Sequence, residues 1–95
     1  MTQEYKIDPN TTTEYVMHLG PDITVYVIQG KCTIETIYNS MTLSVEKGEK
    51  ESYIIQEKVE YRLQNTCNYP CVLRIISELD LKDAIQNEKI ILYGT

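Results

Sequence analysis

Apolar and polar residues alternate with a period of two along most of the chain, which is typical of β-strands with one face in a core. Groups of Gly, Asn and Pro separate these segments. Many short strands at this spacing predict one antiparallel all-β domain over residues 1–95, either a jelly-roll barrel or a sandwich. The expected strands cover residues 2–7, 13–19, 23–29, 31–37, 41–45, 53–55, 59–64, 71–76 and 89–93.

One short helix is expected near the C-terminus, over residues 79–88. Asp80 suits the N-cap position, and Leu81, Ala84 and Ile85 form an apolar stripe at helical spacing.

The alternation also predicts which side chains face the interior of the barrel. In the strand at residues 59–64, the apolar positions are Val59, Tyr61 and Leu63, and the residues between them are polar. We therefore expect these three side chains to point inward.

Two strands, at residues 23–29 and 71–76, are apolar on both faces. A sheet with one solvent-exposed face needs apolar residues only on its buried face. One short helix is too small to cover both outer faces, so we expect a homodimer in which they meet. The predicted interface residues are Tyr26, Ile28, Val72 and Ile76.

The net charge of −5 and an isoelectric point near 4.8 argue against direct nucleic-acid binding, which needs clustered Lys and Arg. No apolar run is long enough to span a membrane, and no secretion signal opens the chain. Three cysteines, an odd number, fit a reducing compartment better than a disulfide scaffold.

The chemistry-bearing residues are few. Cys67, Cys71, Cys32 and His18 offer a zinc set, but the three-residue gap between the first two is unusual and the four come from scattered segments. The ordinary interpretation makes Cys32 and Cys71 small core residues. His18 has no nucleophile and acid beside it in the sequence, and we expect it on the polar face of its strand, at the surface.

Two segments resemble the signature halves of the cupin superfamily. Residues 25–31 read Val-Tyr-Val-Ile-Gln-Gly-Lys, which is similar to the strand that closes the first half on a glycine. Residues 48–65 are similar to the second half, where a glycine turn leads to a His-x-x-x-Asn element that reads Tyr-Arg-Leu-Gln-Asn here. The likeness spans residues 23–78 and implies a cupin-like antiparallel β-barrel.

The chain departs from the metal-binding cupins where their ligands lie. Tyr61 occupies the position of the second-half histidine. His18 matches one first-half histidine, but Val16 and Ile23 stand where the other histidine and the glutamate are expected. A single histidine cannot build the usual three-histidine, one-carboxylate site. The resemblance thus implies a cupin without metal or other cofactor.

Within the superfamily, the chain is most similar to the C-terminal cupin domains of centromere protein C. These domains have a similar Tyr-Val-Ile-x-Gly-Lys strand end and a tyrosine in place of the metal-binding histidine. The resemblance implies a non-enzymatic homodimerisation module in the nucleus, at the centromere, with itself and other kinetochore proteins as partners. The alternative is a free-standing, cytoplasmic protein that binds or modifies a small molecule such as a sugar in the barrel.

Two interpretations of Tyr61 remain open at this point. Its hydroxyl is placed to hydrogen-bond a ligand, or its ring fills the space of the missing metal while the hydroxyl finds a protein partner. Asn65, at the end of the same strand, is expected to satisfy backbone groups.

Overall fold

A computed structural model describes residues 2–77 and 90–92. Within these residues the chain forms strands joined by turns. The strands are β1 (Thr2–Ile7), β2 (Thr11–Thr12), β3 (Val16–His18), β4 (Ile23–Gln29), β5 (Cys32–Tyr38), β6 (Met41–Lys47), β7 (Ser52–Ile55), β8 (Glu60–Asn65), β9 (Cys71–Ile76) and β10 (Ile90–Leu92).

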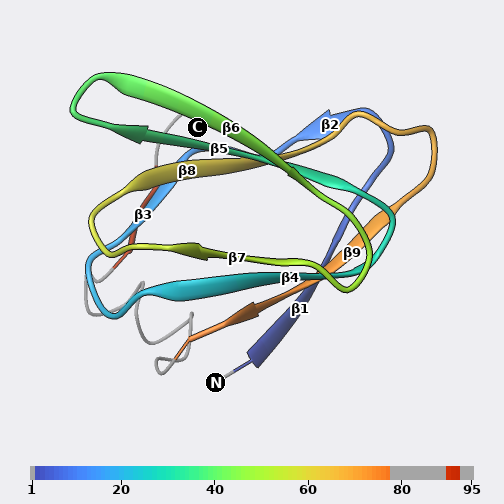
Figure 1. The fold of residues 1–95 in the computed structure, drawn as a ribbon, viewed down its shortest axis with the longest axis horizontal. Coiled ribbons are helices and arrows are strands. Elements are labelled where there is room, and N and C mark those ends of the chain that lie inside the picture. Colours follow the sequence, from blue (N-terminus) through green and yellow to red (C-terminus); the bar gives the residue numbers. More distant parts are fainter. Residues whose placement is uncertain (1, 78–89, 93–95) are drawn as a thin grey trace.

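The strands form two sheets that face each other (Figure 1). The order in the four-stranded sheet is β1-β9-β4-β7, and in the six-stranded sheet it is β10-β3-β8-β5-β6, with β2 also paired to β8. All pairs are antiparallel, so the all-β prediction is confirmed. No strand of the described residues belongs to both sheets, so this part of the chain is a sandwich. The helix expected at residues 79–88 lies outside the described residues.

The core lies between the two sheets and follows the predicted alternation. On β4, Val25 and Val27 are fully buried, and on β8 the buried residues are Tyr61 and Leu63. Val59, which precedes β8, packs against this core and is partly buried. The remaining buried hydrophobic residues are Ile7, Ile23, Cys32, Ile34, Ile55, Cys71, Leu73 and Ile75.

Gly30 turns the chain from one sheet to the other. Its φ of +84° lies in the left-handed region, which residues with a Cβ rarely adopt. A Cβ at this position would lie 2.9 Å from the carbonyl oxygen of Pro70, which is closer than contact allows. The turn thus needs a glycine, because the backbone here lies close to the start of β9.

The segment at residues 13–19 differs from its prediction. Only Val16–His18 is a strand, and His18 is buried instead of exposed. Val16 pairs with Tyr61 in the neighbouring strand, so its side chain and that of His18 belong to the inner face. The prediction placed Met17 and Leu19 on the inner face because both are apolar, whereas the structure places Val16 and His18 there.

Candidate functional site

His18 and Tyr61 lie together in the interior of the sandwich. The resemblance to metal-binding cupins places metal-ligating histidines at these two positions. The Nε2 atom of His18 lies 2.8 Å from the hydroxyl oxygen of Tyr61, and both residues are buried, at 6% and 3% exposure. β3 holds the histidine and β8 holds the tyrosine, and these strands are neighbours in the six-stranded sheet. The tyrosine hydroxyl thus has a protein partner, as one of its two interpretations requires.

Burial keeps both members of this pair uncharged at neutral pH. It lowers the pKa of His18 from 6.5 to about 4, because the charged imidazolium loses its hydration. Burial also raises the pKa of Tyr61 above its ordinary value, and nearby Tyr5 adds to this shift. A neutral imidazole and a neutral phenol share one hydrogen bond, an arrangement that fills space and satisfies polar atoms.

The cysteines and the histidine proposed as a zinc set are not brought together. Cys32 and Cys71 are both buried, and Cys67 is half-buried in the turn before β9. A hydrogen bond that the Cys32 thiol donates to Cys71, together with burial, raises the pKa of Cys32, so these two thiols contact each other inside the core. Across the described residues, no three side chains of His, Cys, Asp or Glu are grouped to hold a metal ion.

The outer face of the four-stranded sheet carries several apolar side chains around the ion pair of Arg74 and Glu4. Thr24 on β4 pairs with Ile54 on one side and with Ile76 on the other, so these three residues form one row across three strands. Ile54 is 62% exposed and Ile76 is 41% exposed. We call the outer patch made by Tyr26, Ile28, Ile54, Val72 and Ile76 the apolar face.

Tyr26, Ile28 and Val72 of the apolar face are half-buried in the single chain. Ile28 lies at a bulge, where the pairing of β4 with β9 shifts between Val27 and Gln29. Ile54 was not among the interface residues expected from the sequence. The signal that pointed to it was the pair Ile54 and Ile55, since alternation places one of two adjacent apolar residues outside.

The outer face of the six-stranded sheet is polar by contrast. Arg62 and Glu35 form an ion pair of 2.9 Å, and the Tyr15 hydroxyl donates a hydrogen bond to the same Glu35 oxygen at 3.2 Å. The guanidinium carbon of Arg62 lies 4.7 Å from the centre of the Tyr15 ring. Among the described side chains, this charged cluster distinguishes the outer face of the six-stranded sheet from the apolar face.

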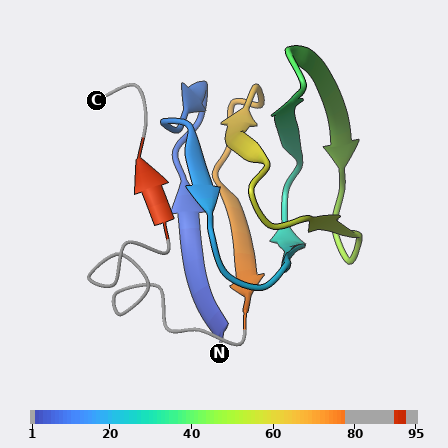
Figure 2. The same cartoon turned by 90° about the vertical axis from the view of Figure 1, so that its left-hand side faces the viewer.

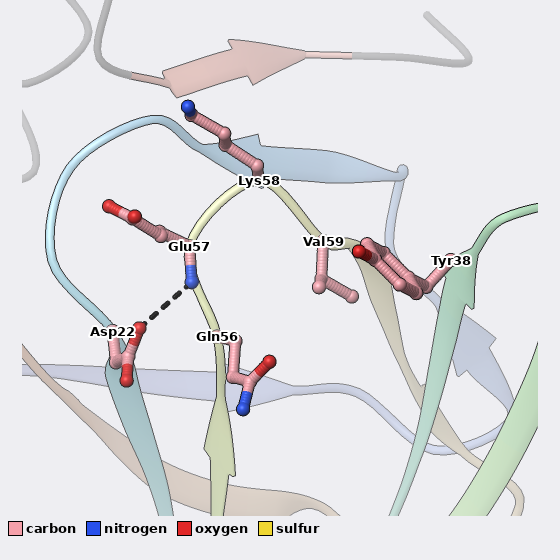
Figure 3. A pocket seen from close by; sticks show the side chains of 6 residues that line it. All are labelled: Asp22, Tyr38, Gln56, Glu57, Lys58 and Val59. Atoms are coloured by element: carbon pink, nitrogen blue, oxygen red, sulfur yellow. Dashed lines mark hydrogen bonds between the residues drawn. The ribbon is translucent and has the colours of Figure 1, made fainter.

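A cavity of about 350 Å³ opens at one end of the sandwich (Figure 3). The Asp22 carboxylate at its rim accepts a hydrogen bond from the backbone N–H of Glu57 at 2.9 Å. Figure 3 shows the side chain of Gln56 between this pair and the ring of Tyr38. The lining residues are Asp22, Tyr38, Gln56, Glu57, Lys58 and Val59.

No protein-family model matches the sequence, and no similar sequence is found among curated proteins. Solved structures do match. The structure of Drosophila melanogaster CENP-C bound to CAL1 superposes with a TM-score of 0.77 at 17% identity, covering 80% of this chain. The chain has a cupin fold. A structure of the Drosophila melanogaster CENP-C cupin domain gives a TM-score of 0.75, also at 17% identity and covering 80% of this chain.

The cupin fold is shared with enzymes as well. An oxalate oxidase superposes with a TM-score of 0.73 at 12% identity, covering 78% of this chain. This chain spans 62% of the first CENP-C structure and 39% of the oxalate oxidase. The similarity to the fold of CENP-C confirms the resemblance expected from the strand end at Gly30 and the Tyr-x-Leu-x-Asn element.

Proposed function

We propose that this cupin domain is a non-enzymatic homodimerisation module that joins two copies through the apolar face. The observation that carries the proposal is the row formed by Ile54, Thr24 and Ile76, with both isoleucines exposed in the single chain. Exposed apolar patches of this kind are typical of protein-protein contacts. Burial of each large apolar side chain in a partner contributes about 1.5–3 kcal/mol.

Self-association is a natural use of such a patch. Strands of one sheet are about 4.8 Å apart, so Ile54 and Ile76 lie roughly 10 Å from each other across the sheet. A second copy related by a two-fold axis presents the same flat, apolar row, and the two faces pack as sheets do in a sandwich. The polar outer face of the other sheet, with its Arg62–Glu35 pair, stays in water.

The interior supports a role without catalysis. The His18 and Tyr61 side chains satisfy each other, and no carboxylate is among the causes of the lowered His18 pKa. A general base needs a pKa near the working pH and free access to a substrate proton, whereas the pKa of His18 is about 4 and its Nε2 atom is engaged with the Tyr61 hydroxyl.

The similarity to CENP-C supports a scaffold role at the kinetochore, in the nucleus. One of the similar CENP-C structures is bound to the protein CAL1, which supports further protein partners besides a second copy. The net charge of −5 supports leaving nucleic-acid contacts to other chains. No helix among the described residues is long and apolar enough to cross a membrane.

A small-molecule binder is the second candidate, and the cavity in Figure 3 favours it. Its volume of about 350 Å³ suits a small ligand such as a sugar, and Tyr38, Gln56 and Asp22 offer hydrogen-bonding groups. Stabilisation of the protein by a sugar in a thermal-shift panel, lost in Tyr38→Ala, would favour this candidate.

Sedimentation of the purified protein tests the dimer. We expect a dimer at about 100 µM, roughly a hundredfold above a dissociation constant of ~1 µM. Ile54→Asp with Ile76→Asp should give a folded monomer, because each charge would be buried without a partner in the interface. Thr12→Asp with Thr42→Asp is the matched control, since these exposed threonines lie on the polar outer face. A monomeric unmodified protein at this concentration would overturn the proposal.

A further inference from the structure

The inner face of β6 extends beyond the opposite sheet. Met41 and Leu43 pair with Tyr38 and Thr36 and point to the same side as the buried row of β5, yet they are 74% and 56% exposed. The four-stranded sheet ends at β7, which has only four residues and pairs with β4 alone among the described strands. No strand of the described sheets lies opposite β6, so its apolar inner row is open.

A shallow cavity continues along this open side. It has a volume of about 230 Å³ and is lined by residues of β5, β7 and the segment before β8. It shares Tyr38, Gln56 and Val59 with the cavity in Figure 3, so the two form one elongated depression. An elongated groove beside a strand suits an extended chain better than a compact ligand.

The free edge of β6 also offers backbone hydrogen bonds. β5 and β6 are joined by the two-residue turn Asn39–Ser40, both at positive φ, so Tyr38 and Met41 form the first hydrogen-bonded pair. In an antiparallel ladder every second residue then bonds to the neighbour. The N–H and C=O groups of Thr42, Ser44 and Glu46 therefore point away from β5, toward the open edge.

The other edge strands are short or carry charges along their length, whereas the charges of β6, Glu46 and Lys47, lie only at its end. β1 carries Glu4 and Lys6, while β7 and β10 have only four and three residues. β6 has seven residues, and its first five, Met-Thr-Leu-Ser-Val, contain no charge and no proline. Natural edge strands usually carry such features against unwanted pairing. Figure 2 shows β6 and β10 at opposite ends of their sheet.

A second copy is a poor occupant for this edge. If the domain dimerises through the apolar face, as proposed above, a second two-fold contact at β6 would link dimers into an open-ended chain. A segment of another protein closes the edge without this consequence. Asp22, Glu57 and Lys58 line one end of the groove, and Glu46 lies on the outer face of β6, 4.0 Å from Lys31. Acidic residues outnumber basic ones at the groove, and the whole chain carries −5, which favours a basic segment.

We propose that β6 binds an extended segment of another protein as an added strand. The segment has apolar side chains at alternate positions, which pack on Met41 and Leu43 of the inner row of β6, and Lys or Arg residues between them. Its backbone pairs with Thr42, Ser44 and Glu46. A homodimer would thus present two such sites.

A phage-displayed library of random peptides of about ten residues, the upper length of common strands, is the probe. Selection on the intact protein should enrich peptides with apolar residues at every second position and basic residues between them. Absence of enriched peptides, or enrichment of a motif with helical spacing, would overturn the proposal.

Two variants separate backbone pairing from groove contacts. Ser44→Pro removes an N–H from the open edge while the ladder to β5 stays intact, and Ser44→Thr is its control. Leu43→Asp places a charge in the apolar inner row of β6, and Thr42→Asp places one on the outer face of the same strand. We expect Ser44→Pro and Leu43→Asp to weaken binding of the selected peptides about tenfold or more, and both controls to bind within about threefold of the unmodified protein.

Sedimentation of the same variants distinguishes this site from the dimer interface. Ser44→Pro should remain dimeric. Ile76→Asp, at a residue that does not line the groove, should weaken the dimer and still bind peptide. If Ser44→Pro dissociates the dimer, the edge pairs with a second copy and the proposal is wrong. If the protein is monomeric but binds peptide through β6, the dimer proposal fails alone.

Discussion

The hydroxyl oxygen of Tyr61 lies 2.8 Å from the Nε2 atom of His18, and these residues are 43 positions apart in the sequence. Their ring centroids are 5.5 Å apart, with the planes inclined by 33°. The tyrosine stands where the resemblance to metal-binding cupins places a histidine. The single histidine of the chain thus bonds to the residue that replaces another ligand, and the pair fills that part of the interior.

The first prediction concerns metal content. The protein purified without chelators should contain no stoichiometric Fe, Mn, Ni or Zn, because one histidine cannot supply a three-histidine site and its Nε2 atom is already engaged. Elemental analysis is the measurement. About one metal ion per chain that is lost in His18→Ala would contradict this prediction.

The second prediction concerns pH. Burial lowers the pKa of His18 from 6.5 to about 4 in the folded chain. Between these values the unfolded chain binds the proton and the folded chain does not, so the free energy of unfolding falls as the pH falls from 6.5 to 4. The contribution is fully present above pH 6.5 and is lost by about pH 4. Its size is up to about 3 kcal/mol, since one pKa unit corresponds to ~1.4 kcal/mol.

His18→Gln is the control for the pH effect. Glutamine keeps a hydrogen-bonding group near Tyr61 but does not titrate, and the carboxylates of the chain titrate in both proteins. The difference between the two urea-unfolding curves should therefore isolate the histidine. A parallel decline of both proteins through this pH range would show that His18 makes no contribution.

Alternation predicted the interior correctly where a strand has one clear apolar face. Tyr61 and Leu63 are buried and separated by the polar Arg62, so the phase of β8 could be assigned from the sequence. Around His18 both phases looked similar, since Val16 and Met17 are both apolar. Local pattern alone cannot choose between them, and the contact with β8 decides.

The exposure of some side chains and one ion pair depend on how the strands are placed relative to one another in the folded chain. Ile54 lies on the apolar face because of its pairing with Thr24, and Met41 and Leu43 are open because the opposite sheet stops at β7. The Arg62–Glu35 pair joins residues 27 positions apart. Only the outward position of Ile54 has a local signal, in its apolar neighbour Ile55, whereas the resemblance to cupins predicted the fold as a whole.

The third prediction compares two glycines. Gly30→Ala should destabilise the protein by at least about 2 kcal/mol, because alanine at φ +84° is strained and its Cβ meets the Pro70 carbonyl oxygen. Gly48→Ala is the matched control. Its Cβ would lie 3.3 Å from a Glu51 carboxylate oxygen, at the end of a side chain that can move. Equal denaturant midpoints for the two variants would mean that the turn at Gly30 tolerates a side chain.

The fourth prediction concerns Asn65, whose expected role with backbone groups is confirmed. Its side chain is almost fully buried at the end of β8, and its Nδ2 group donates to the carbonyl oxygens of Ile7, Asp8 and Tyr69 at 3.1, 3.3 and 2.8 Å. Its Oδ1 atom accepts the N–H of Cys67 at 3.0 Å. One side chain thus ties β1 and the turn before β9 to β8.

Asn65→Ala should lower the free energy of unfolding by about 3 kcal/mol or more, because it leaves buried backbone groups without partners and opens a cavity. Asn65→Asp should be nearly as harmful, since a carboxylate cannot donate to three carbonyl oxygens. Asn68→Ala, in the same turn at an exposed position, should stay within about 0.5 kcal/mol. Chemical denaturation measures all three, and an Asn65→Ala midpoint equal to that of Asn68→Ala would show that water replaces the amide and that the three segments do not depend on it.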